Sequence, residues 1–256
     1  FDVRNWPGDD QWQQFVSGEI HDGVPQLATL IGQPWPMKDT TEVREAYTPY
    51  LYGYAGWFSA KENTIEIGED LDKSVVLHEL SHAWFNDDWF ADRWINEGLA
   101  QVYSNAAVKA MGGTANKPNT VSSTADGAVK LEDWGNPNLT TGADKVEAFG
   151  YNASFWVLQQ IVDEVGLDKM RAIFTAVEKN TNPYVDGGVT DTMSTQADWK
   201  RLLDLLDETA GSTNADQLFA DYVVSPSVDF ELNDRSTART ALAALTKRGG
   251  DWAPPI

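Results

Sequence analysis

Apolar side chains recur at near-helical spacing over residues 8–31, which predicts a long amphipathic helix near the beginning of the chain. The positions are Trp12, Phe15, Val16, Ile20 and Val24. Pro25 is expected to interrupt this helix near its end, because proline lacks the backbone N–H that helical hydrogen bonding needs. Residues 40–68 carry short runs of β-branched and aromatic residues instead, which predicts strands at about Val43, 46–47 and 50–52.

The strand pattern is clearest over residues 54–67. Apolar positions flank a polar stretch with period-two alternation, at Tyr54, Gly56, Phe58, Ile65 and Ile67. The tripeptide Lys61-Glu62-Asn63 between them predicts a turn. We therefore expect an antiparallel hairpin here.

Helical patterns dominate the rest of the chain. Residues 73–86 predict a helix capped by Asp70 or Asp72, and a second helix opens around Glu97 and runs to about Met111. Residues 113–147 are polar and turn-rich, which predicts a long loop. Further helices are expected at about 150–165, 167–179, 197–209, 214–223 and 235–247.

These patterns predict an α+β fold built as one unit from two lobes. Residues 1–112 form a strand-rich N-terminal lobe that includes the helix over 73–86 and the helix that runs to about Met111. Residues 113–256 form a helical C-terminal lobe. The chain begins at Phe1 without an initiator methionine, so we expect it to be a piece of a longer protein with flanking domains.

Charge and composition exclude several classes of function. The chain has 39 acidic and 19 basic residues, a net charge of -20, which argues against nucleic acid and anionic membrane surfaces as partners. No run approaches the roughly 18 apolar residues of a membrane span, so a soluble chain is expected. Without cysteine there are no disulfides. The compartment stays open, with a lean toward a bacterial secreted or envelope-exposed protein.

Candidate chemistry is concentrated in the run His78-Glu79-Leu80-Ser81-His82. On a helix, His78 and His82 lie on one face, where their imidazoles can hold one zinc ion. Glu79 lies one position round, where its carboxylate can reach a water molecule on that ion and act as a base. The alternative is a surface helix with two solvated histidines.

A catalytic zinc ion takes three protein ligands and keeps a fourth position for water. The chain has no cysteine, and its remaining histidine, His21, is far upstream, so the third ligand is expected to be a carboxylate. Glu97, in an Asn-Glu-Gly context, is the leading candidate. Asp87, Asp88 and Asp92 are the competing ligands because they lie nearer to His82 in sequence.

The histidine pair is followed by Trp84-Phe85 and then by Trp94-Ile95-Asn96-Glu97-Gly98-Leu99-Ala100. This combination resembles the gluzincin metallopeptidases, in particular the aminopeptidase-N-like family, over roughly residues 54–175. The resemblance implies a zincin fold of the thermolysin and aminopeptidase-N type, with one Zn²⁺ ion on His78, His82 and Glu97. Fourteen residues separate His82 from Glu97, about one helical turn fewer than is usual in the family, so a trimmed connection is expected.

Two further family features can be compared with this chain. Residues 149–158 resemble the stretch that bears the family's transition-state tyrosine, which implies that Tyr151 stabilises the oxyanion. The alternative is a tyrosine that packs at a helix start. The run Ser59-Ala60-Lys61-Glu62-Asn63 is similar to the family's Gly-Ala-Met-Glu-Asn motif, whose Glu binds the substrate amine, but the hairpin pattern favours a turn. Aminopeptidase specificity is therefore not implied.

The expected function is zinc-dependent hydrolysis of peptide bonds in a peptide or protein substrate, with Glu79 as general base. A catalytically idle, zinc-containing peptide-binding module and a true aminopeptidase are the alternatives. The loop over residues 113–147 is expected either to form a substrate-facing rim or to be a plain surface insertion. The acidic run from Asp186 to Asp191 is expected to be an exposed turn rather than a calcium site, because it lacks a regular series of ligands.

Overall fold

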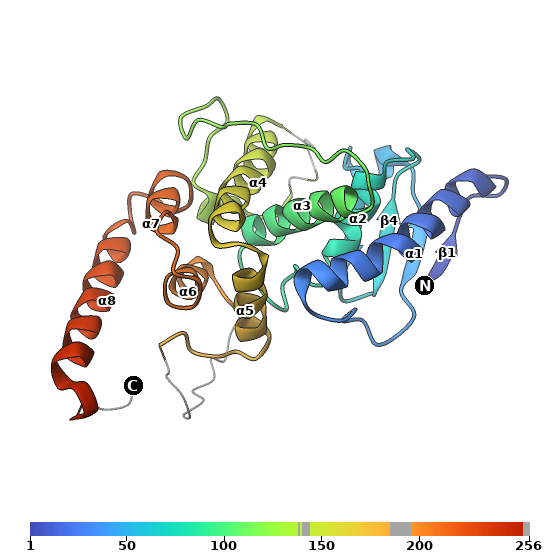
Figure 1. Cartoon of the computed structure of the whole chain (residues 1–256). Coiled ribbons are helices and arrows are strands. Elements are labelled where there is room, and N and C mark those ends of the chain that lie inside the picture. The colour runs from blue at the N-terminus through green and yellow to red at the C-terminus, as the bar shows by residue number, and fades with distance from the viewer. Residues whose placement is uncertain (138, 140–143, 185–195, 253–256) are drawn as a thin grey trace.

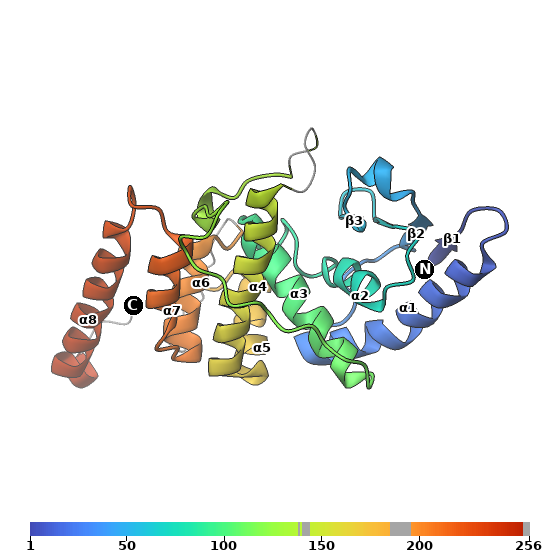
Figure 2. The same cartoon turned by 90° about the horizontal axis from the view of Figure 1, so that it is seen from above.

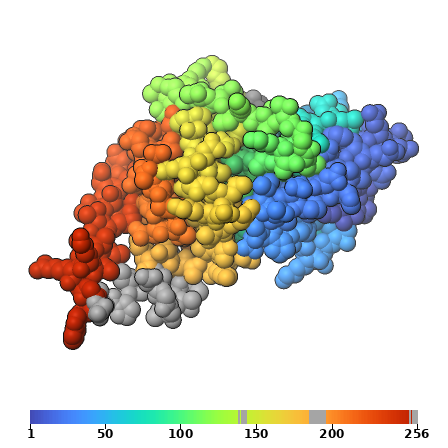
Figure 3. Space-filling view, viewed as in Figure 1, coloured from blue at the N-terminus to red at the C-terminus, as the bar shows by residue number. Residues whose placement is uncertain are grey.

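A computed structural model describes residues 1–137, 139, 144–184 and 196–252 of the chain. A small sheet and the first long helix lie at one end of the molecule, and the last helix lies at the other (Figures 1 and 2). The space-filling view follows the same order, from N-terminal residues at one end to C-terminal residues at the other (Figure 3). No helix within the described residues is long and apolar enough to cross a membrane.

The four strands form one mixed sheet in the order β1-β2-β4-β3. Their bounds are Asp2–Arg4 for β1, Glu42–Glu45 for β2, Gly56–Ser59 for β3 and Thr64–Ile67 for β4. β1, β2 and β4 run parallel, whereas β3 pairs antiparallel with β4 and lies at the edge. The predicted hairpin over residues 54–67 is thus confirmed, with its turn ending at Asn63, whose φ is 52°.

Two parts of the strand prediction differ from the structure. The segment η1 (Thr48–Leu51) is a 3₁₀ turn, because Pro49 supplies no N–H for a strand ladder and has the φ that a helical turn needs. β1 has no predicted counterpart, since three residues are too few for a recognisable alternation.

The helix α1 (Asp10–Ile31) begins at Asp9, whose side chain accepts a hydrogen bond from the N–H of Trp12. It continues through Pro25, so the predicted interruption is wrong. Proline deprives the carbonyl of His21 of its helical donor. His21 is exposed, and water can satisfy that carbonyl at little cost.

The helix α2 (Lys73–Ser81) is capped by Asp72 and is shorter than predicted, with His82 as its last, capping residue. The amide of Asn86 donates to the carbonyls of His82 and Ala83, at 2.8 and 3.0 Å, and so closes the helix end. The chain then turns into the core through Trp84 and the residues after it.

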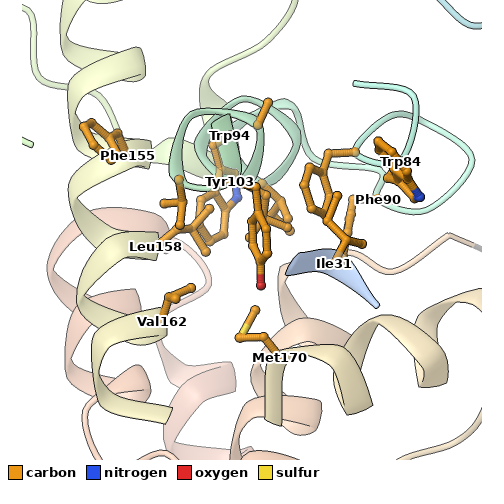
Figure 4. Packing of buried hydrophobic residues seen from close by; sticks show 14 of the residues in the cluster. Ile31, Trp84, Phe90, Trp94, Tyr103, Phe155, Leu158, Val162 and Met170 are labelled. Atoms are coloured by element: carbon orange, nitrogen blue, oxygen red, sulfur yellow. The ribbon is translucent and has the colours of Figure 1, made fainter. Parts of the chain in front are cut away.

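The helix α3 (Arg93–Ala110) packs closely against α4 (Lys145–Val165). Gly98 makes the approach possible, because a Cβ on it would lie 2.7 Å from the carbonyl oxygen of Ser154. The aromatic core continues below, where Trp94 and Tyr103 of α3 face α4 and Met170 of the next helix (Figure 4). Because α3 begins at Arg93, Glu97 lies in the second turn of this helix instead of opening it, as was predicted.

Asp144 accepts hydrogen bonds from the N–H groups of the first turn of α4, so the helix starts before residue 150, where it was predicted. Tyr151 consequently lies inside α4 and not at its start. The remaining helical segments follow in chain order. They are α5 (Leu167–Glu178), α6 (Trp199–Leu205), the π-helical η3 (Leu206–Ala210), α7 (Ala215–Leu218), the π-helical η4 (Phe219–Val223), α8 (Phe230–Gly249) and η5 (Gly250–Trp252).

The architecture is thus a four-stranded mixed sheet followed by a mostly helical remainder. The zincin fold and the lobe boundary after residue 112 stay predictions.

Candidate metal centre and active-site cleft

Three predicted metal ligands converge where α2 and α3 meet. The ligand atoms of His78, His82 and Glu97 all lie within 4.8 Å of one another. Nε2 of His78 lies 3.2 Å from Nε2 of His82, and Oε2 of Glu97 lies 3.3 Å from the first and 3.4 Å from the second. In the described part of the chain, no other group of three His, Asp or Glu side chains is brought together in this way.

These spacings fit a tetrahedral zinc ion. Protein nitrogen and oxygen atoms bind zinc at about 2.0–2.2 Å, so two ligands at a tetrahedral angle lie about 3.3–3.5 Å apart. The observed separations are 3.2, 3.3 and 3.4 Å. Two imidazoles and one carboxylate also form the donor set of catalytic sites that leave a fourth position for water. The three residues can therefore hold one zinc ion.

Hydrogen bonding orients one of the two imidazoles. Nδ1 of His82 lies 2.9 Å from the carbonyl oxygen of Phe85, which assigns the ring proton to Nδ1 and leaves the lone pair of Nε2 facing the cluster. The ring of Phe58 stacks on the same imidazole with 6.3 Å between centroids. Nδ1 of His78 is buried and has no hydrogen-bond partner among the described residues. The chain after α2 thus positions the second histidine more firmly than the first.

The three ligands perturb one another electrostatically. Burial raises the pKa of Glu97, but His82 and His78 oppose burial strongly and hold the pKa well below its usual range. Burial lowers the pKa of His82, whereas the Glu97 carboxylate more than offsets this and raises it to about 9. A divalent cation competes with the imidazole proton for the same lone pair, so metal binding releases that proton.

Glu79 belongs to α2, and its side chain extends toward the edge strand β3. Its carboxylate rests against Gly56, where an added Cβ would lie 2.6 Å from Oε1 of Glu79, so a glycine is needed for this approach. Glu79 is 6% exposed, and burial raises its pKa against the opposing effect of His78 and His82. A carboxylate with a raised pKa is suited to accept a proton and return it.

The ligands and Glu79 line a cleft of 560 Å³. Its aromatic lining includes Trp57 and Phe58 of β3 and Phe85, which follows α2, besides two tyrosines. Asn136 and Pro137 line it as well. The predicted loop over residues 113–147 therefore contributes to the rim of the cleft.

Arg93 and Glu147 form a buried ion pair next to Tyr151. No sequence pattern indicates this pair. Arg93 donates from Nη1 and Nη2 to the two carboxylate oxygens of Glu147, at 2.9 and 2.8 Å. The hydroxyl of Tyr54 and the indole N–H of Trp134 donate to the same carboxylate, at 2.8 and 2.9 Å. Nη2 of Arg93 also donates to the hydroxyl oxygen of Tyr151, at 3.1 Å.

Two tyrosines, Tyr54 and Tyr151, line the cleft, and their hydroxyl groups differ in their hydrogen bonds. The hydroxyl of Tyr54 donates a hydrogen bond to Glu147, and burial together with that carboxylate raises the pKa of Tyr54 to about 12. Tyr151 accepts from Arg93, and no described hydrogen bond uses its own proton. Burial and the nearby Glu97 carboxylate raise the pKa of Tyr151 far above its usual value, so it stays protonated. Tyr151 is the hydroxyl with a proton free for a substrate.

Arg93 could have been suspected from sequence, because it precedes Glu97 by one helical turn and so shares its face of α3. Glu147 and Trp134 could not. The ion pair joins residues that are 54 positions apart, and no local pattern encodes such a contact.

The competing ligands lie outside the three-residue group. Asp87 and Asp88 line the cleft, whereas the carboxylate of Asp92 accepts a hydrogen bond of 2.6 Å from the backbone N–H of Trp199. Glu62 is exposed in the turn between β3 and β4. The acidic run from residue 186 to residue 191 lies outside the described residues.

Known proteins are similar to this chain over about a third of its length. Glutamyl aminopeptidases of Mus musculus and Rattus norvegicus are each 32% identical to it over 84 residues, 31% of this chain. Putative aminopeptidase-2 of Caenorhabditis elegans is 26% identical over 113 residues, 38% of this chain. No protein-family profile matches the chain.

The matched segments are 8% of the two mammalian proteins and 6% of the nematode protein, so the chain spans a small part of these relatives. Over about a third of its length, the chain is related to aminopeptidases and thereby to peptide hydrolases.

Proposed function

We propose that this chain is a zinc-dependent peptidase with a zincin fold. The observation that carries the proposal is the convergence of His78, His82 and Glu97 at tetrahedral spacing. The partial similarity to aminopeptidases supports the same class of reaction. A bound zinc ion polarises the scissile carbonyl and lowers the pKa of a water molecule.

Glu79 serves as the general base in this proposal. It is the remaining carboxylate on α2 beside the ligands, it lines the cleft, and its raised pKa suits proton exchange. Glu79 takes the proton of the attacking water molecule and passes it to the leaving amine. The hydroxyl of Tyr151 donates a hydrogen bond to the oxyanion that develops on the scissile carbonyl.

The residues of β3 bear on whether the chain cleaves inside peptides or removes amino-terminal residues. In the aminopeptidase-N-like family the substrate amine binds a glutamate of the Gly-Ala-Met-Glu-Asn motif, and the similar run here places Glu62 in an exposed turn. The strand that does line the cleft carries Gly56, Trp57 and Phe58, which offer no carboxylate. We therefore propose cleavage inside peptides. Removal of amino-terminal residues is the alternative, because the relatives are named as aminopeptidases.

Digestion of a mixed peptide library tests the proposal. Wild type and Glu79→Gln are loaded with zinc, their metal content is measured by elemental analysis, and products are identified by mass spectrometry. Wild type is expected to cleave, and Glu79→Gln to lose at least about a hundredfold in rate while keeping its zinc. Glu62→Gln, in the exposed turn, is the matched control and is expected to keep full activity.

Acetylated copies of the same peptides decide the end preference. Cuts within acetylated peptides identify an endopeptidase, whereas cleavage restricted to free amino termini identifies an aminopeptidase. A wild-type protein that holds one zinc ion and cleaves nothing would contradict the proposal and favour a zinc-containing peptide-binding module.

A further inference from the structure

We propose that Arg93 is a positioning residue for the reaction, because it holds the Tyr151 hydroxyl with its proton directed into the cleft. This inference rests on the proposed function, since it concerns the hydroxyl that is to meet the oxyanion. It adds to that function a five-residue device, the Arg93 clamp, made of Arg93, Glu147, Tyr54, Trp134 and Tyr151.

The carboxylate of Glu147 holds the guanidinium in place. It is 4% exposed and accepts four hydrogen bonds, two from Arg93, one from Tyr54 and one from Trp134. The guanidinium carbon of Arg93 also lies 3.9 Å from the ring centroid of Trp134. This cation–π contact holds the guanidinium group over the indole ring. Burial raises the pKa of Glu147, but hydrogen bonds from Arg93 and Tyr54 more than offset this, so the ion pair is kept.

All four Nη hydrogens of Arg93 have acceptors. Nη1 donates to Glu147 and to the carbonyl oxygen of Gly135, and Nη2 donates to Glu147 and to Tyr151. The two Nη groups of Arg93 are therefore occupied within the protein, whereas its Nε–H is buried without a hydrogen-bond partner among the described residues and lies 3.8 Å from Oε1 of Glu97. A lysine ammonium has three donors on one nitrogen, so it cannot replace the four bonds that the planar fork makes to Glu147, Gly135 and Tyr151.

The bond to Tyr151 determines where the phenolic proton points. Since the hydroxyl oxygen accepts from Nη2 of Arg93 at 3.1 Å, its own O–H is directed away from the guanidinium. The ring of Tyr151 is held from the side by Trp134, at 5.1 Å between centroids and 77° between planes. Tyr151 lines the cleft, so its proton is available to a substrate oxygen there.

The clamp is also close to the metal ligands. Arg93 stands one turn before Glu97 on α3, and its Nε lies 3.8 Å from Oε1 of Glu97. Tyr151 comes from α4. Arg93 thus links the helix that bears the third ligand to the helix that bears the hydroxyl, and it fixes their relative position at the cleft.

A double-mutant cycle on the zinc-loaded full chain tests this role. Arg93→Lys is expected to lower kcat about tenfold to a hundredfold, with KM changed less than about twofold, because only oxyanion stabilisation is lost. In the Tyr151→Phe background, Arg93→Lys is expected to cost less than about twofold, because the two residues act as one unit. Arg171→Lys is the matched control. That arginine donates to the carbonyls of Thr29 and Leu30 far along the chain and does not line the cleft.

A second readout does not depend on turnover. With tyrosine labelled by ¹³C at Cζ, the NMR signal that disappears in Tyr151→Phe belongs to Tyr151. Because Cζ responds to hydrogen bonding at the hydroxyl, this signal is expected to shift in Arg93→Lys and to stay in place in Arg171→Lys. An unchanged signal in Arg93→Lys would overturn the clamp, whatever the activity.

The outcomes separate this inference from the proposed function. Additive losses in the cycle, or a raised KM with unchanged kcat, would overturn the role of Arg93 while the peptidase stands. Absence of cleavage by zinc-loaded wild type would overturn the proposed function and, with it, the catalytic role of the clamp. The NMR signal would then show only whether the contact exists.

Discussion

Burial raises the pKa of both glutamates of the candidate site, but their net shifts run in opposite directions. Histidines beside Glu97 lower its pKa, so this carboxylate stays charged and available as a ligand. Desolvation dominates at Glu79 and raises its pKa, which favours proton exchange. The surroundings of each side chain, and not the residue type, thus suit Glu97 to the proposed role of ligand and Glu79 to the proposed role of base.

Glu97→Ala is expected to remove most of the bound zinc, because two imidazoles alone do not make a stable site. Elemental analysis after gel filtration measures the zinc content per chain. Asp87→Ala and Asp88→Ala are the matched controls, since both carboxylates line the cleft outside the ligand group. If Glu97→Ala kept its full zinc content and one of the controls lost zinc, the aspartate replaced in that control would be the third ligand.

At the scale of elements, α3 organises the site. It carries Arg93 in its first turn and Glu97 in its second, and it packs against both α2 and α4. Gly98 follows the proposed ligand at a place where α3 packs directly against the backbone of α4. The Asn-Glu-Gly context therefore has a packing reason for its glycine in addition to the chemical reason for its glutamate.

Gly98→Ala is expected to lower the free energy of unfolding by about 1–3 kcal/mol, because the added methyl group would overlap the Ser154 carbonyl and the Leu158 side chain. Urea unfolding followed by circular dichroism measures the change. Gly18→Ala is the control. Gly18 is exposed on α1 with nothing within 4 Å of an added Cβ, so this change should raise the free energy of unfolding by about 0.5–1 kcal/mol. Equal effects would refute the packing argument.

The start of α3 is tied to the start of α6 through Asp92, whose carboxylate accepts from the N–H of Trp199. Burial raises the pKa of Asp92 from 3.8 to about 6. Between these two values the folded chain keeps a proton that the unfolded chain has released. The free energy of unfolding should therefore contain a contribution from Asp92 that falls as the pH rises from about 4 to 6.

Asp92→Asn retains the acceptor oxygen and cannot ionise. This variant should lack that pH-dependent contribution, so its free energy of unfolding minus that of wild type should rise as the pH rises from about 4 to 6. Urea unfolding of both proteins across this range measures the difference between them. Asp22→Asn, at an exposed position on α1, is the control. A stability difference between wild type and Asp92→Asn that does not vary with pH would contradict the assignment.

At the scale of the whole molecule, the candidate centre joins parts that are distant in sequence. Residues from β3, α2, α3 and α4 and from the loop before α4 all line the cleft. A ligand that bridges α2 and α3 binds the folded chain in preference to the unfolded chain. Zinc should accordingly report on the integrity of the whole site.

Zinc at about a thousand times its Kd should raise the Tm of wild type by roughly 10 °C, and a chelator should reverse the shift. Differential scanning calorimetry with and without zinc measures it. The Tm of Glu97→Ala should hardly respond to zinc. Equal shifts in both proteins would show that zinc binds elsewhere.

Local patterns in the sequence predicted the elements whose residues are close together in the chain. The β3–β4 hairpin, most of the long helices and the spacing of His78 and His82 belong to this group, because each depends on periodicity over a few turns or a few strand residues. The same patterns placed the end of α2 too late, since Asn86 and the burial of Trp84 stop that helix.

By itself, the sequence determined the two imidazoles, the neighbouring candidate base and a short set of carboxylates that could complete a zinc site, because ligand chemistry and helical spacing are local properties. Only the tertiary structure decided that Glu97 meets the histidines, that Glu79 rests on Gly56, and that Glu147 clamps Arg93 behind Tyr151. These contacts depend on how α2, α3, α4 and β3 pack, and packing is a property of the whole chain.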